Sequence, residues 1–143
     1  MKKTISFILF IVLIIVAFLA AKYTNYKTER NKIIEFNREY ETYLNKQISG
    51  REITTAINRA INNNEQNSVS KDENGFYIEN DINSVLIEIK MKDIDKTYKM
   101  ETLYNSDMNN FLLYYGDIEF ECTSIEYNSK GKVKHVVFKQ KTE

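Results

Sequence analysis

The hydrophobic pattern begins with a run from Ile5 to Ala21 that is apolar except for Ser6 and contains no charged residue. As an α-helix this run would rise about 25 Å, slightly less than the roughly 30 Å hydrocarbon core of a bilayer. Tyr23 and Tyr26 can extend the span into the interface, where tyrosine rings are favoured. The run therefore predicts a transmembrane anchor over residues 5–21, with lipid-facing positions that include Ile5, Phe7, Phe10, Ile14, Phe18 and Ala21.

A cleaved signal peptide is the competing interpretation, because the run is only a little longer than the apolar part of such a peptide. Cleavage favours small residues at positions −3 and −1. A cut after Ala21 places Leu19 at −3, and a cut after Ala20 places Phe18 there. Both fit poorly, so the pattern favours an uncleaved signal-anchor and a single-pass protein of the cell membrane.

The charges around the span give two opposing indications of orientation. Basic residues before it are Lys2 and Lys3, and those that follow within seventeen residues are Lys22, Lys27, Arg30, Lys32 and Arg38. The positive-inside rule, counted strictly, leans against an external domain. A basic start directly before an apolar segment is, however, what the secretion machinery reads as a signal. We expect the domain to lie on the extracytoplasmic side.

A helical period continues beyond the anchor, since no Gly or Pro occurs between Ala21 and Gly50. Apolar residues recur there at spacings of three and four, at Ile33, Phe36, Tyr40, Tyr43, Leu44 and Ile48. This pattern predicts an amphipathic helix over residues 22–48 whose apolar stripe packs against the sheet of the following domain. Ser49 and Glu52 form a capping-box signature for a second short helix, which alone is too short to cover that sheet.

The remainder reads as a sheet with period-two alternation. Predicted strands lie around residues 85–91, 98–104, 118–127 and 133–139, and the last two are joined by a hairpin over 128–131. Asn74-Gly75 predicts a turn. A short helix capped by Ser106-Asp107 and ending at Gly116 is inserted between strands.

The expected fold class is α+β, with an antiparallel sheet of about four strands. The expected division is a basic N-terminus (1–4), the anchor (5–21), the amphipathic helix (22–48) and the domain (49–143).

Composition adds that the domain can bury a real core, because 43% of the 143 residues are apolar and 13% are aromatic. Lys plus Arg equals Asp plus Glu at 20 each. No basic excess marks a polyanionic partner, so we expect no nucleic-acid binding.

Candidate chemistry is sparse. The single Cys122 excludes an intrachain disulfide and a thiolate metal site, and the single His135 has no partner nearby in the sequence. Asp72-Glu73-Asn74-Gly75 lacks the alternating oxygen ligands and the distal glutamate of a calcium loop. We therefore assign no catalytic, cofactor-binding or metal-binding residue and expect no cofactor. We interpret Cys122 as a small buried hydrophobe that shares a strand face with Phe120.

Ten tyrosines are the most unusual feature of the composition. Tyrosine suits interfaces, because its ring is apolar and its hydroxyl is polar. A possible interface consists of Tyr98, Tyr104, Tyr114 and Tyr115. Packing in the core and at its rim is the alternative role.

Several segments carry a resemblance to known proteins, namely Ile48-Ser49-Gly50-Arg51-Glu52, Asn62-Asn63-Asn64-Glu65-Gln66-Asn67, Tyr98-Lys99-Met100-Glu101 and Phe120-Glu121-Cys122-Thr123-Ser124-Ile125-Glu126-Tyr127. With these segments the chain resembles a family of small, uncharacterised single-span membrane proteins of low-GC Gram-positive bacteria, a resemblance that implies no activity. In architecture it is also similar to type IV pilins and pseudopilins. It departs from them because no Gly precedes Gly50 and no acidic residue precedes Glu29. The order of elements also resembles cystatin-like and NTF2-like folds.

The leading hypothesis is a non-enzymatic, membrane-anchored interaction or assembly protein of the bacterial envelope. Its partners would be the lipid bilayer and either another envelope protein or a second copy of the chain. The alternatives are a pilin-like structural subunit and a small-molecule-binding or enzymatic domain of cystatin-like or NTF2-like shape.

Overall fold

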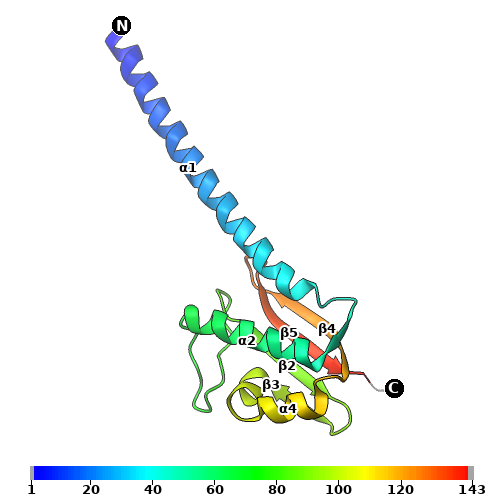
Figure 1. The fold of residues 1–143 in the computed structure, drawn as a ribbon. Helices are drawn as coiled ribbons and strands as arrows, with labels where there is room; N and C mark the ends of the chain where they lie inside the picture. Colours follow the sequence, from blue (N-terminus) through cyan, green and yellow to red (C-terminus); the bar gives the residue numbers. More distant parts are fainter. Residues whose placement is uncertain (1, 142–143) are drawn as a thin grey trace. The chain divides into compact units, whose positions relative to one another are not determined.

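The computed structural model describes residues 2–141, and the side chains of all of these except Lys2, Lys3 and Asp107. The chain divides into two units, Met1–Glu35 and Phe36–Glu143, which are described separately below. The described part of the first unit consists entirely of the long helix α1 (Lys2–Glu41), whose last turns belong to the second unit (Figure 1).

The second unit is an α+β domain, as the sequence predicts. After α1 its elements are β1 (Gln47–Ser49), α2 (Gly50–Gln66), β2 (Leu86–Met91), β3 (Lys96–Lys99), α3 (Met100–Thr102), η1 (Leu103–Asp107), α4 (Met108–Tyr115), β4 (Glu119–Tyr127) and β5 (Val133–Gln140). The five strands form one sheet in the order β1-β4-β5-β2-β3.

The sheet is mixed, so the expectation of an antiparallel sheet of about four strands is wrong in two respects. β2 and β5 are parallel, with Ile87 opposite Val136 and Ile89 opposite Phe138, whereas the other neighbouring strands are antiparallel. The alternation in β2 was sufficient to predict a strand, but it carries no information about which strand lies alongside it. The predicted hairpin of β4 and β5 is confirmed.

The fifth strand, β1, occupies residues for which the sequence predicts helix. α1 ends at Glu41 rather than at Ile48, and Ile48 instead pairs with Phe120 across β1 and β4. Two causes act together: Phe120 on β4 offers Ile48 a partner, and Ser49, the N-cap of α2, has the extended conformation that an N-cap requires, with φ −82° and ψ 158°. The residues that lead into it therefore extend as a strand.

The predicted capping box of α2 is present in full. The Ser49 hydroxyl accepts a hydrogen bond from the backbone N–H of Glu52, and the Glu52 carboxylate accepts one from the backbone N–H of Ser49. The apolar face of α2 is buried in the core, at Ile53, Ala56, Ile57, Ala60 and Ile61.

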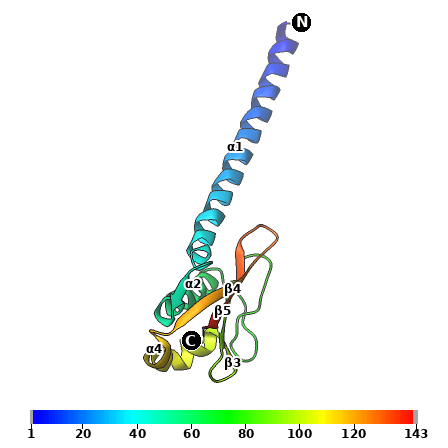
Figure 2. The same cartoon turned by 90° about the vertical axis from the view of Figure 1, so that its right-hand side faces the viewer.

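Helices α2 and α4 lie on one face of the sheet (Figures 1 and 2). The last turns of α1 add Tyr40, which is fully buried, and Tyr43, whose ring meets Phe138 edge to face at 5.5 Å. The predicted apolar stripe thus contributes to the core at Phe36, Tyr40 and Tyr43, while Leu44 is exposed. α2 extends to Gln66 and is therefore longer than the short helix that the sequence predicts.

The segment after β3 is helical where the sequence predicts a continuing strand. Met100 and Leu103 are buried at the start of a helical stretch that runs through α3, η1 and α4. η1 is a π-helical turn, and Ser106 and Asp107 lie within it rather than capping a helix. The end of this stretch at Tyr115, before Gly116, is as predicted.

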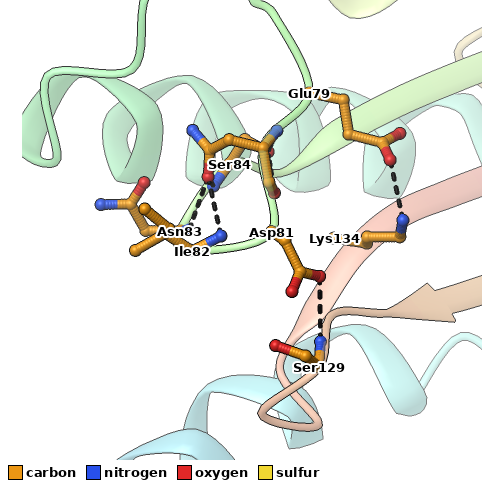
Figure 3. Close-up of polar contacts among 8 residues, drawn as sticks. Glu79, Asp81, Ile82, Asn83, Ser84, Ser129 and Lys134 are labelled. Atoms are coloured by element: carbon orange, nitrogen blue, oxygen red, sulfur yellow. Dashed lines mark hydrogen bonds and ion pairs between the residues drawn. The ribbon is translucent and has the colours of Figure 1, made fainter.

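The long connection from α2 to β2 is held by polar contacts (Figure 3). The Asn80 side-chain oxygen accepts hydrogen bonds from the backbone N–H groups of Ile82, Asn83 and Ser84. Asp81 accepts one from the backbone N–H of Ser129 in the β4–β5 hairpin, at 3.0 Å. These contacts order a loop that its polar composition left without a predicted structure. The Asn74-Gly75 turn within it is confirmed, with Gly75 at φ 81°.

Candidate functional site

The apolar helix is the first candidate functional feature. The large apolar side chains from Ile5 to Leu19 are each 40–66% exposed. The helix is long and apolar enough to cross a membrane, and a signal sequence near an N-terminus would meet the same criteria. The predicted lipid-facing residues Ile5, Phe7, Phe10, Ile14, Phe18 and Ala21 are exposed along this helix.

Side chains that could bind a metal ion are dispersed over the described part of the chain. No group of three or more His, Cys, Asp or Glu side chains there could hold a metal ion. His135 lies half-buried on β5, with its Nε2 3.8 Å from the Glu88 carboxylate.

Cys122 shares a sheet face with Phe138, its partner on β5, but it is half-buried rather than fully buried as expected. The pairing of β4 with β5 shifts register between Cys122 and Ser124, and the Cys122 side chain packs against the edge of the core. Burial raises the pKa of Cys122, so little thiolate forms near neutral pH and the thiol is a poor nucleophile.

Three of the four predicted interface tyrosines meet at one cavity of about 310 Å³. Tyr98 comes from β3 and Tyr114 and Tyr115 come from α4, and the remaining lining residues are Leu103, Asn110 and Phe111. Tyr104, the fourth tyrosine, is exposed and does not line the cavity. The sequence did not indicate Leu103, Asn110 or Phe111 as site residues, although the spacing of Phe111 and Tyr115 by four places them on one helical face.

The aromatic lining continues into the core on one side and reaches solvent on the other. The Phe111 ring lies 5.6 Å from that of Tyr115 and 6.1 Å from that of Phe120, which is fully buried. Tyr98 is only 9% exposed, whereas Tyr114 is 69% exposed. The cavity is therefore a surface hollow with a buried aromatic floor and an exposed aromatic rim.

Two charged groups border this aromatic cluster. The Tyr115 hydroxyl donates a hydrogen bond to the Asp93 carboxylate at 3.1 Å. Burial and this hydrogen bond together raise the pKa of Tyr115. The Lys96 ammonium lies over the Tyr98 ring, 4.2 Å from its centroid.

A second hollow of about 230 Å³ lies where β1 meets β4. Its lining residues are Asn45, Lys46, Gln47, Glu121, Cys122 and Lys141. Lys46 is already paired with Glu52 at 2.7 Å, and the lining carries charges of both signs. It offers neither a uniform charge nor an apolar surface.

Comparison of the chain with protein-family models, with curated proteins and with solved structures found no match. The site must therefore be interpreted from its own chemistry.

Proposed function

We propose that this protein is a non-enzymatic interaction or assembly protein of the bacterial cell envelope. Its N-terminal helix stays uncleaved in the membrane and holds the α+β domain on the extracytoplasmic side. The observation that carries the proposal is the exposure of an apolar helix in a chain whose other unit has a hydrophobic core of its own. Exposed apolar side chains in such numbers are unfavourable in water and favourable in lipid.

The domain supports a binding role better than a catalytic one. Its candidate nucleophile and its histidine lie on different strands without an acid–base partner at hydrogen-bond distance, among the residues described. The surface instead offers exposed apolar side chains on α4, namely Leu113 at 74% and Tyr114 at 69% exposure, beside the aromatic cavity. Neighbouring apolar side chains at the surface are typical of a contact site for another molecule.

The anchor is tested by fractionating a bacterial host that expresses the full chain. We expect the protein to remain in the membrane pellet after washing with alkaline carbonate. Recovery of a soluble product whose N-terminus is Lys22 would show cleavage and would refute the anchor.

The orientation is tested with reporters fused after Glu143. Alkaline phosphatase should be active at this position, because this enzyme folds productively only outside the cytoplasm. A reporter that works only in the cytoplasm should be inactive there. An inactive phosphatase and an active cytoplasmic reporter would place the domain in the cytoplasm. The positive-inside rule gives that orientation when the basic residues from Lys22 to Arg38 are counted strictly.

A pilin-like subunit remains the second function, supported by an apolar N-terminal helix that leads into a domain with a sheet. The absence of Gly before Gly50 and of an acidic residue before Glu29 weighs against it. Shearing of cells separates the two functions: a pilin-like subunit would be released in filaments, whereas we expect this protein to stay with the membrane.

A further inference from the structure

We infer that the cavity between β3 and α4 binds a cationic group, the guanidinium or ammonium of an Arg or Lys side chain on a partner protein. This inference names the partner chemistry for the proposed interaction role, and it therefore rests on that role for its biological meaning. Three features of the cavity support it: the type of its lining side chains, the charge around it and the geometry of the helix that forms it.

The lining side chains are those that bind cations through their rings. Four of the six lining residues are aromatic, namely Tyr98, Phe111, Tyr114 and Tyr115. The face of an aromatic ring carries partial negative charge, and a cation within about 6 Å of the ring centroid is attracted to it. Lys96 already lies over Tyr98 in this way, which shows that at least one ring of the lining can hold an ammonium group.

The polar atoms of the lining suit a hydrogen-bond donor. Tyr115 gives its hydroxyl proton to Asp93, so the lone pairs of the phenol oxygen are left to accept from a bound N–H group. The negative charge of Asp93 also acts on the cavity through this short contact. An anionic ligand would meet repulsion at the same point.

The helical segments that form one wall of the cavity carry no basic residue. From residue 100 to residue 129, a stretch that includes η1, α4 and β4, there is no Lys or Arg. The acidic residues in this stretch are Glu101, Asp107, Asp117, Glu119, Glu121 and Glu126. Of these, Asp117 is paired with Arg51 at 3.0 Å, and Glu101 is buried and accepts the backbone N–H of Tyr77. Glu121 lines the second hollow, and the charged groups that border this cavity are Asp93 and Lys96. The helical wall of the cavity therefore adds no positive charge that would repel a bound cation.

The backbone around the cavity is unusual as well. Leu103, which lines the cavity, begins the π-helical turn η1. Single π turns inside helices are rare and occur frequently at functional sites. Along the chain, this turn lies between the buried Met100 and α4, and side chains of α4 form the rim of the cavity.

The test measures binding of small blocked amino acids to the full chain in detergent micelles, by NMR titration or calorimetry. The probe is N-acetyl-arginine amide, and its neutral isostere is N-acetyl-citrulline amide. We expect saturable binding of the arginine probe in the millimolar range, as befits a single side chain. The citrulline probe should bind about tenfold more weakly. Free arginine is tested alongside, because it has a charged amino group and a charged carboxyl group that an arginine residue within a polypeptide lacks. A site for an arginine side chain of a protein should bind free arginine no more tightly than the blocked probe.

Four variants connect the binding to the cavity. Tyr114→Ala should weaken binding of the arginine probe about fivefold, and Tyr114→Phe should restore it because the ring remains. Leu113→Ala is the matched control, since Leu113 is an exposed neighbour on α4 that does not line the cavity. Lys96→Met should tighten binding, because it removes a competing charge beside Tyr98.

Equal binding of the arginine and citrulline probes, or no binding of either by the unaltered chain, would overturn the inference. So would an equal loss of binding in Tyr114→Ala and Leu113→Ala. None of these results would affect the carbonate and reporter experiments, so failure of the cation site and failure of the membrane role can be told apart. Because Tyr114 and Leu113 are exposed, their variants are expected to fold, and an unchanged melting temperature verifies this.

Discussion

At two points in the domain, a buried asparagine side chain forms hydrogen bonds with backbone N–H and C=O groups. Asn64, at the end of α2, is fully buried and bonds to both polar groups of Val85, donating to its carbonyl and accepting from its N–H, each at 2.8 Å. Asn37, in the last turns of α1, does the same across the β4–β5 hairpin, with Gly131 and Val133 as its partners. Each carboxamide thus completes the hydrogen bonding of backbone groups at the N-terminal end of a strand, β2 for Asn64 and β5 for Asn37.

The Asn64 contact leads to a prediction for stability. Asn64→Ala should lower the free energy of unfolding by about 2–4 kcal/mol, because it leaves a buried N–H and a buried carbonyl of Val85 without a partner. Asn62→Ala, an exposed position on the same helix, is the control and should change stability by less than about 0.5 kcal/mol. Urea unfolding followed by circular dichroism measures both. Equal stability of the two variants would contradict this role for Asn64.

The junction of α2 with the end of α4 shows how elements are fitted to one another. The backbone N–H groups of Gly50 and Arg51 donate to the carbonyls of Ile118 and Gly116. A Cβ atom at Gly50 would lie 2.1 Å from the Tyr115 carbonyl oxygen, so the two helix ends can approach this closely only with glycine at this position. The capping box of α2 is built at the same junction, and the Lys46 ammonium bonds to the carboxylate of Glu52 at 2.7 Å.

This arrangement predicts a pH dependence for α2. The hydrogen bond from Lys46, followed by that from the Ser49 backbone, lowers the pKa of Glu52 in the folded state. A carboxyl group with a lowered pKa stabilises the fold above its unfolded pKa of about 4.3, and this stabilisation is lost as the pH falls through the folded pKa. Glu52→Gln should therefore be less stable than the unaltered chain at pH 7, and the difference should shrink towards pH 3.

Thermal melts at the two pH values provide the measurement for Glu52. Glu65→Gln, an exposed position in the last turn of the same helix, serves as the control. A difference between Glu52→Gln and the unaltered chain that is the same at pH 7 and pH 3 would show that the Glu52 charge does not stabilise α2.

At the scale of the whole molecule, the chain joins two parts that suit different surroundings. The first unit has apolar side chains exposed all around the helix, and the second has a core closed by α2, α4 and the end of α1. In the proposed function the first determines where the protein resides and the second what it binds. Changes to the apolar run should therefore alter location without altering the domain.

The double variant Leu13→Arg, Val16→Arg tests this separation. Each arginine near the centre of a spanning helix adds about 2.5–3.5 kcal/mol to the free energy of insertion, which together offsets most of what the apolar run supplies. We expect the membrane-bound fraction and the activity of the C-terminal phosphatase reporter to fall several-fold. Leu13→Ile with Val16→Ile is the control and should behave like the unaltered chain. Full retention of the arginine variant after carbonate washing would argue against a lipid-spanning helix.

Local patterns in the sequence were sufficient to predict the apolar helix, the capping box at Ser49 and Glu52, the Asn74-Gly75 turn and the β4–β5 hairpin. Each of these depends on residues close together in the chain, so periodicity and turn chemistry indicate it directly. The tyrosines were noticed as a group for their number, but the sequence could not indicate that Tyr104 stands apart from the other three.

Other features were decided only by tertiary structure. The parallel pairing of β2 with β5 joins residues about fifty positions apart, and no local pattern selects that partner. Ile48 fits a helical stripe equally well, yet it becomes part of a strand because Phe120 on β4 offers it a partner and the N-cap of α2 requires an extended approach. The cavity is lined by side chains from β3, from the start of η1 and from α4, so it exists only when these segments are packed together. The sequence determines which short segments form and which side chains are apolar, whereas burial of those side chains against distant partners decides how the segments are combined.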